Sequence, residues 1–197
     1  TGYPTTAITY SSVPELPSSM ILTDNGDGTA TLSGTPAPGD GGVYVLSLVG
    51  SNGVSPDANQ LLTVSIGDGP VITSASSDTF VVGSSGSFTI TTTGYPAPAI
   101  SYTGTLPSGV SFTDNLDGTA NLNGIPASGT GGLYALFLKA SNDVPPDATQ
   151  DFTLTVQEAP LFTSANSANF TVESAGTFSI TTSGYPSAAI TVISDPA

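Results

Sequence analysis

The chain repeats itself. From Leu16 onward, the same residue types return at a constant offset of 90 residues. The clearest example is Asp-Asn-Gly-Asp-Gly-Thr at 24–29, which returns as Asp-Asn-Leu-Asp-Gly-Thr at 114–119. In the same way, Tyr44 returns as Tyr134. A fixed period of this size indicates one folding unit per period, so any function belongs to a string of modules and not to a single pocket.

Composition favours an all-β module. Of the 197 residues, 38% are hydrophobic and 8% are charged, and much of the remainder is Thr, Ser, Gly, Pro and Asn. β-Branched and aromatic residues suit strands, and Gly, Pro and Asn suit the turns between them. Disorder is the competing interpretation for a chain rich in Gly, Pro and Ser. Disordered chains lack regularly spaced apolar residues, and here these residues recur at a regular spacing.

Alternation of apolar and polar residues predicts strands and their buried faces. Leu136 and Leu138 are expected to point inward, and Phe137 and Lys139 outward. No stretch has the 3.6-residue period of a helix. The predicted core is apolar, closed and independent of any cofactor, and it is drawn from Phe88, Ile90, Leu122, Tyr134, Leu136, Phe152 and Leu154.

The middle of the chain carries eight short strands separated by turn signals, which is typical of a β-sandwich. These strands are expected near 70–75, 79–82, 86–92, 99–103, 110–113, 118–123, 133–141 and 149–157. Pro70 and Pro160 mark the starts of modules. We therefore predict a partial module that lacks its first strands (1–68), a complete module (69–158), and a partial module of first strands only (159–197).

Several motifs recur around these strands. They are Leu-Pro-Ser-Gly-Val at 106–110, Asp-Gly-Thr-Ala in the hairpin, Gly-x-Pro at 34–36 and 124–126, Gly-Gly-x-Tyr, and Ala-Ser-Asn at 140–142. Together they resemble a family of Ig-like, cadherin-like domains in bacterial surface proteins and adhesins. The resemblance covers the whole chain. It implies tandem Ig-like β-sandwich modules in a large exported protein, and it implies no catalytic residues.

Tyr44 and Tyr134 occupy the place of the tyrosine corner, a Tyr at the start of the sixth Ig strand whose hydroxyl bonds to upstream backbone. Two residues further on, where antibody domains carry a cysteine, stand Leu46 and Leu136. Apolar packing is therefore expected to replace the disulfide between the two sheets.

Charge restricts the partners. The chain has fifteen acidic residues and one basic residue, Lys139, so its net charge is −14. The chain lacks the basic side chains that neutralise phosphates, so nucleic acid is not an expected partner. Cysteine is absent, and no apolar stretch approaches the 18 residues of a membrane span. The Thr-rich, Ser-rich and lysine-poor composition favours an extracellular or cell-surface location, with no membrane insertion in this segment.

Aspartates suggest one metal site. In stacked Ig-like modules, the loops between the second and third, fourth and fifth, and sixth and seventh strands face the end of the preceding module. This arrangement would gather five aspartates at one junction, where calcium would relieve their repulsion; they are Asp68, Asp114, Asp117, Asp143 and Asp147. The alternative is that Asp114 and Asp117 only cap the backbone of a hairpin turn, with Gly118 at positive φ.

Few residues are available for catalysis. The chain has no His, Cys or Arg, which excludes Ser-His-Asp triads, zinc sites and phosphate clamps. Only a carboxylate pair could act, as in glycosidases. Asp114 and Asp117 are the nearest candidates, but they lie at a convex hairpin tip. We therefore predict that the chain is not an enzyme.

Gly-Tyr-Pro triplets place Tyr3, Tyr95 and Tyr185 at equivalent positions. An exposed Tyr-Pro could stack on a sugar or peptide, whereas a packed ring would belong to the contact between modules. The second interpretation is favoured. Asn169 begins an Asn-Phe-Thr glycosylation sequon, but its copy at Thr79 does not, which indicates a chance match.

Two functions follow. The first is a structural segment of an extracellular stalk or filament, in which short connections between modules restrict bending. Its partners would be neighbouring modules and other copies of the chain in a fibre. The second is an adhesin whose loops bind a glycan or protein ligand.

The outer parts of the chain are complementary. Residues 159–182 supply the first two strands that 1–68 lacks, and 183–197 repeats what 1–15 already contains. Either the chain is a window of a continuous array, or separate chains complete one another by donating strands. The duplicated stretch at 183–197 favours the continuous array.

Overall fold

The computed structural model describes residues 3–193. Residues 1–2 and 194–197, which belong to the first and third predicted modules, lie outside the described residues. The described part contains strands and no helix, and therefore no helix long and apolar enough to cross a membrane. The strands are β1 (Ala7–Val13), β2 (Met20–Asp24), β3 (Ala30–Gly34), β4 (Gly42–Ser51), β5 (Ala58–Ile66), β6 (Asp68–Ile72), β7 (Ser77–Val81), β8 (Gly86–Tyr95), β9 (Ala99–Gly104), β10 (Val110–Asp114), β11 (Thr119–Gly124), β12 (Gly132–Ser141), β13 (Ala148–Phe162) and β14 (Thr182–Tyr185).

Eight strands, β6 to β13, form the middle repeat. One sheet has the order β10-β11-β8-β6. The other contains β9, β12 and β13, and β7 joins it by pairing in parallel with β13. This is the strand arrangement of an Ig-like sandwich, in which the strands named A, B, E and D form one sheet, and β6, β8, β11 and β10 take these places. The all-β, Ig-like fold class is therefore confirmed.

The described chain divides into two compact units. The first contains the residues up to Val71 together with Thr92–Ala99 and Ala140–Ala148. The second contains Ile72–Thr91, Ile100–Lys139 and the residues from Thr149 onward. The module boundaries at 68 and 158 stay a prediction.

Burial confirms the predicted direction of the strands in the middle repeat. Leu136, Leu138 and Leu154 are almost completely buried, whereas Phe137 is 44% exposed. Lys139 is also exposed, as predicted. Phe88 is half-buried and packs its ring against Phe152, with ring centroids 5.0 Å apart. Tyr134, also placed in the core by the pattern, is only half-buried, and its hydroxyl donates to Thr130 O in the preceding loop.

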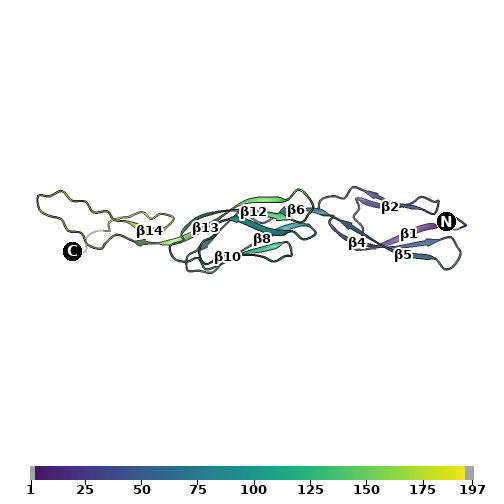
Figure 1. Ribbon diagram of the computed structural model, residues 1–197, viewed down its shortest axis with the longest axis horizontal. Coiled ribbons are helices and arrows are strands. Elements are labelled where there is room, and N and C mark those ends of the chain that lie inside the picture. The colour runs from purple at the N-terminus through teal and green to yellow at the C-terminus, as the bar shows by residue number, and fades with distance from the viewer. Residues whose placement is uncertain (1–2, 194–197) are drawn as a thin grey trace. The chain divides into compact units, whose positions relative to one another are not determined.

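The first repeat has fewer strands around its core. Its strands form a three-stranded sheet, β1-β4-β5, and a separate pair, β2-β3, which Figure 1 shows on different sides of the repeat. Leu46 is fully buried. The hydrophobic side chains that pack against the buried residues are themselves only partly buried; they are Met20, Leu32, Leu48, Leu62 and Val64.

The third repeat forms the least regular structure. Between 163 and 181 no residue is assigned to a strand, and beyond β13 the described residues, which end at 193, contain one short strand, β14. β14 pairs with the end of β13, with Phe162 opposite Thr182 (Figure 1).

Candidate functional site: the repeat junctions

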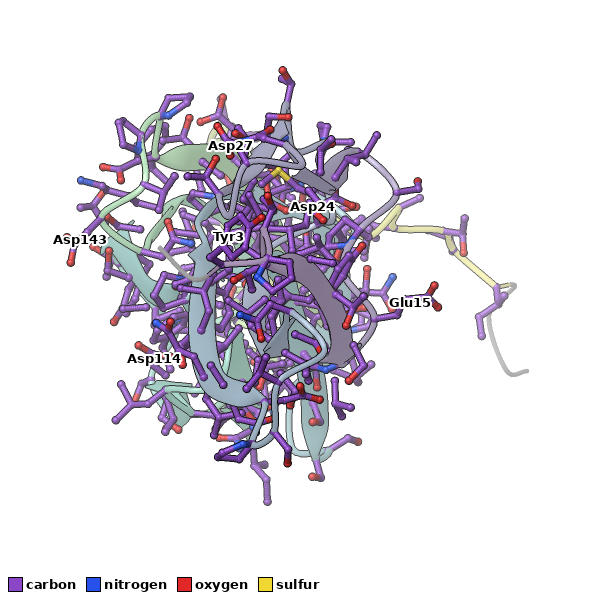
Figure 2. All side chains as sticks on the ribbon, turned by 90° about the vertical axis from the view of Figure 1, so that its right-hand side faces the viewer. Tyr3, Glu15, Asp24, Asp27, Asp114 and Asp143 are labelled. Carbon is purple, nitrogen blue, oxygen red and sulfur yellow. The ribbon has the colours of Figure 1, made fainter. Side chains whose placement is uncertain are left out.

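The Asp-rich hairpin tips are self-contained turns. In the first repeat, Asp24 Oδ1 accepts a hydrogen bond from Gly26 N at 3.1 Å, and Asp27 Oδ1 accepts one from Thr29 N at 3.0 Å. Figure 2 shows Asp24 and Asp27 on this hairpin and Glu15 pointing into solvent. The two carboxylates thus accept hydrogen bonds from backbone amides of their own turn, as the hairpin interpretation predicted.

The second hairpin uses the same bonds. Asp114 Oδ1 accepts from Leu116 N at 3.0 Å, and Asp117 Oδ1 accepts from Thr119 N at 3.0 Å. Gly118 has a φ of 86°, so the predicted positive φ is confirmed. The other oxygen of Asp114 accepts from Ile100 N on β9 at 3.1 Å, just as Asp24 Oδ2 accepts from Ile8 N on β1 at 3.0 Å. Each hairpin is therefore tied to a strand outside it.

Hydrogen bonds to the Thr119 hydroxyl and amide lower the pKa of Asp117. The equivalent bonds to Thr29 lower the pKa of Asp27. A general acid in a glycosidase needs a raised pKa, because it must hold a proton at neutral pH. Neither aspartate meets this requirement.

A second recurring cluster lies where one repeat passes into the next. We call this cluster the junction. It consists of the acidic residue near the end of a repeat, the Gly-x-Gly-Gly loop that leads into β4 or β12, and the Gly-Tyr-Pro triplet of the following repeat. In the first junction, Asp68 Oδ2 accepts a hydrogen bond from Gly39 N at 2.8 Å. A Cβ added to Gly41 would lie 2.6 Å from Asp68 Cβ and 2.8 Å from Tyr95 Cβ, so only glycine fits there. All these residues belong to the first compact unit.

The second junction repeats the first at an offset of 90 residues. Glu158 replaces Asp68 and accepts two hydrogen bonds, from Gly129 N at 2.6 Å and from Gly131 N at 3.0 Å. A Cβ added to Gly131 would lie 2.7 Å from Glu158 Cβ and 2.9 Å from Tyr185 Cβ. These residues all lie in the second compact unit. The two amide donors lower the pKa of Glu158, so the carboxylate stays ionised under mildly acidic conditions.

Asn142 ties the first junction together. Its side chain is 8% exposed, and its amide nitrogen donates to Asp68 O at 2.7 Å and to Pro96 O at 2.8 Å. Its side-chain oxygen accepts from Val144 N at 3.2 Å. One buried amide therefore links the connection between repeats to the Tyr-Pro loop and to its own loop. Such a fully bonded buried group resists displacement, because breaking it leaves buried acceptors unpaired.

The three equivalent tyrosines differ in exposure. Tyr95 and Tyr185, whose Cβ atoms face Gly41 and Gly131, are half-buried. Tyr3, labelled in Figure 2, is 96% exposed. Gly2, the first residue of its triplet, lies outside the described residues. Burial at the junction thus supports a packing role for Tyr95 and Tyr185.

The predicted tyrosine corner is confirmed in both copies. Tyr44 OH donates to Asp40 O, and Tyr134 OH donates to Thr130 O, each at 2.8 Å and four residues upstream. These bonds fix the loops that carry Gly39 and Gly129 just before β4 and β12. The corner therefore positions the amide donors of each junction.

The five aspartates of the predicted calcium site have separate protein partners or surroundings. Asp68 bonds to Gly39 N, Asp147 accepts from Ser141 Oγ at 2.6 Å, and Asp143 is exposed with a φ of 65°. Asp114 and Asp117 accept hydrogen bonds within their turn, Asp114 also accepts one from Ile100 N, and both belong to the other compact unit. Within residues 3–193, no three acidic side chains are grouped in a way that could hold a metal ion. The interdomain calcium site stays a prediction.

Sequence patterns did not identify the glycine amides or Asn142 as junction residues. A usable signal was present, because Gly-x-Gly-Gly occurs at both 39–42 and 129–132. Glycines that recur just before Tyr44 and Tyr134 indicate that another part of the chain approaches the backbone closely at these positions. The identity of the approaching group depends on tertiary contacts.

No protein-family model matches the sequence, and no curated protein matches it. Among solved structures, a tandem pair of titin Ig domains matches with a TM-score of 0.51 at 15% identity, over 79% of this chain and 84% of that chain. A variant of a three-domain titin fragment matches with a TM-score of 0.44 at 19% identity, over 83% of this chain and 59% of that one. The chain thus spans less than two thirds of the three-domain fragment. At these identities the likeness shows the fold alone, which is that of tandem Ig-like β-sandwich repeats.

Proposed function

We propose that this chain is a structural segment of an extracellular stalk, filament or surface protein, in which Ig-like repeats are joined by junctions that restrict bending. The observation that carries the proposal is the recurrence of one set of contacts at both junctions. Asp68 and Glu158 each accept from the loop glycine amides, and the loop glycines each face a Gly-Tyr-Pro tyrosine.

The connections leave little free chain. β5 ends at Ile66 and β6 begins at Asp68, and β13 runs without interruption from Ala148 to Phe162. Short connections restrict the relative motion of modules more than long flexible linkers do. The buried Asn142 amide adds a further restraint at the first junction.

Composition supports the extracellular location and the resemblance to bacterial surface proteins. The chain has no cysteine, one basic residue and a net charge of −14. High net charge of one sign keeps proteins soluble and separate. A long exposed array would benefit from this repulsion.

Spin-label distance measurements test the rigidity directly. Cysteines replace the exposed Thr9 and Thr113 in a chain that has no other cysteine. We expect a narrow distance distribution in this parent and a broad one after insertion of Gly-Ser-Gly-Ser behind Gly67. The same insertion between Gly26 and Asp27, at an exposed hairpin tip, is the control and should leave the distribution narrow. Equal widths in the parent and the Gly67 insertion would contradict the proposal.

The adhesin alternative has less support, because the loops that would bind a ligand are engaged at the first junction. Pro96 O accepts from Asn142, and the Tyr95 ring is half-buried. Tyr3 is the one fully available ring of the three described. Glycan or protein binding that is lost in Tyr3→Ala, and retained in Tyr10→Ala, would favour the adhesin.

A further inference from the structure

The two Asp-rich hairpin tips differ at a single position. Gly26 of the first tip is replaced by Leu116 in the second, and the other residues from 24 to 29 return unchanged at 114–119. The first tip therefore contains the pair Asn25-Gly26, and the second contains Asn115-Leu116. Because glycine has no Cβ, its backbone nitrogen can approach a neighbouring side chain without steric hindrance. The replacement therefore affects how easily the backbone can react with Asn25.

The first tip offers room for such an approach. Asn25 and Gly26 are both exposed. Gly26 has a φ of 75°, and a Cβ added to it would meet no atom within 4 Å. Leu116 is 78% exposed, so the equivalent tip also reaches solvent in the middle repeat, which another repeat precedes. Exposure is thus a property of the hairpin in both copies, and water reaches Asn25.

Similar hydrogen bonds restrain the two asparagines. Nδ2 of each donates to the threonine hydroxyl four residues on, at 2.8 Å for Asn25 and 2.9 Å for Asn115. A further side-chain bond joins Asn25 Nδ2 to Thr31 Oγ1 at 3.1 Å, and another joins Asn121 Nδ2 to Asn115 Oδ1 at 3.3 Å. In both tips the amide of the following residue donates to the preceding aspartate, at 3.1 and 3.0 Å. Since these restraints are alike, the main difference between the tips is the residue that follows the asparagine.

We propose that Asn25 is a site of spontaneous deamidation. When the exposed tip opens locally, Gly26 N attacks Asn25 Cγ. The N–Cγ bond forms, the Cγ–Nδ2 bond breaks, and Nδ2 leaves as ammonia with the proton that Gly26 N gives up. Water then opens the resulting succinimide at one of its two carbonyls, which yields aspartate or isoaspartate at position 25. Water is the only other reactant, and no electron is transferred.

A second Asn-Gly pair is protected by its place in a sheet. Asn123-Gly124 lies in β11, and Gly124 is paired with strands on both sides. A Cβ added to Gly124 would overlap Gly109 O, so this backbone is closely packed. The ladder holds the Gly124 backbone in place, and the nitrogen cannot turn toward the preceding side chain. Asn123 is therefore expected to keep its amide.

The reaction would alter one hairpin and leave its copy unchanged. Either product adds a carboxylate to a tip that already carries Asp24 and Asp27, in a chain with a net charge of −14. Isoaspartate also lengthens the backbone by one atom, which displaces the hydrogen bond from Asn25 N to Thr29 O, 2.9 Å long. The neighbouring bond from Ile8 N to Asp24 Oδ2, at 3.0 Å, ties this hairpin to β1. We therefore expect isoaspartate to loosen the attachment of the hairpin to β1.

Peptide mapping by mass spectrometry tests the proposal on the full chain. The folded protein is incubated at neutral pH and at a raised temperature below its unfolding transition. We expect loss of the Asn25 amide, with aspartate and isoaspartate as products, while Asn115 and Asn123 keep their amides in the same sample. If the Asn25 amide is lost no faster than that of Asn115, the proposal is wrong.

Reciprocal variants show whether glycine decides the reaction. Gly26→Leu should abolish deamidation at Asn25, and Leu116→Gly should introduce it at Asn115. Urea unfolding of each variant verifies that the chain is folded during the incubation. Deamidation that continues at Asn25 in folded Gly26→Leu would contradict the proposal, as would an intact Asn115 in folded Leu116→Gly. Neither result affects the junction proposal, which spin-label distances test separately.

Discussion

The middle and third repeats contain nearly the same strand sequence in two different states. Residues 87–92 read Ser-Phe-Thr-Ile-Thr-Thr and lie in β8, whereas residues 177–182 read Thr-Phe-Ser-Ile-Thr-Thr and are almost entirely outside any strand. Ile90 is 0% exposed and Ile180 is 54% exposed. A segment with a strong strand preference thus forms a strand where neighbouring strands can pair with it, as β8 does.

This difference has a physical cause. A strand makes its backbone hydrogen bonds with neighbouring strands and has none within itself. β8 receives these bonds from β11 and β6. Strand preference mainly reflects packing against neighbours, so an identical pattern without neighbours gains little from it.

The largest test compares the same truncation in the two repeats. Ile90→Ala should lower the free energy of unfolding by about 2–5 kcal/mol, because it leaves a cavity in a closed core. Ile180→Ala should change it by less than about 0.5 kcal/mol in dilute solution, because the side chain is already exposed. Urea unfolding of the two variants measures both values. Equal costs would show that the third repeat is packed like the middle one.

Asn142 and its equivalent Asn52 sharpen the comparison at the loops. Asn142→Ala should destabilise the chain by about 1–3 kcal/mol, because Asp68 O and Pro96 O lose a buried donor. Asn52 accepts a local bond from Val54 N in an exposed loop, so Asn52→Ala should cost less than about 0.5 kcal/mol. Thermal or urea unfolding distinguishes the two outcomes. If Asn142→Ala costs as little stability as Asn52→Ala, the hydrogen bonds of the buried Asn142 amide do not stabilise the junction.

Glu158 offers a test of the junction by pH. Its folded pKa lies below the ordinary value of 4.5, so the carboxylate contributes stability above that value and loses the contribution as the pH falls through the folded pKa. Amide shifts of Gly129 and Gly131, followed by NMR, should therefore change only below the ordinary pKa of glutamate. Glu158→Gln should abolish this titration. A midpoint at or above 4.5 would mean that the two amide bonds are not formed in solution.

The hairpin tips allow a reciprocal exchange. Leu116 has a φ of 62°, where its counterpart Gly26 has 75°. The left-handed region costs an L residue about 1–2 kcal/mol, and glycine loses part of this advantage through greater freedom in the unfolded chain. Leu116→Gly should therefore stabilise the protein by less than about 1 kcal/mol, and Gly26→Leu should destabilise it. Thermal unfolding of the two variants measures both changes. Destabilisation by Leu116→Gly would show that the exposed Leu116 side chain contributes more than the strain costs.

The smallest expected effect concerns metal. The fold is predicted to need no cofactor, so the melting temperature should be the same in calcium and in excess EDTA. A rise in calcium that disappears in Asp68→Asn or Asp147→Asn would instead support the predicted interdomain site. Such a rise would also show that the aspartates move together in solution.

The sequence alone predicted the strand positions of the middle repeat and its tyrosine corner. The 90-residue period, the alternation around Leu136 and the Asp-Gly turn signals predict the strands of the middle repeat closely, except that β13, predicted to end at 157, continues to Phe162. The tyrosine corner at Tyr44 and Tyr134 was also predicted, and the structure confirms it. These features depend on local periodicity, turn chemistry and the position of one residue in a strand, all of which one sequence records.

Tertiary structure decided what those signals could not. The bonds from the glycine amides to Asp68 and Glu158, and the three hydrogen bonds of Asn142, depend on contacts that no local pattern specifies. Whether Phe80 or Phe170 is buried likewise depends on which strands lie beside it, and the two residues look alike in the sequence. Local sequence sets which segments are able to form strands, because it sets side-chain pattern and turn geometry. Edge pairing and core closure require distant segments to meet, so only the assembled structure determines them.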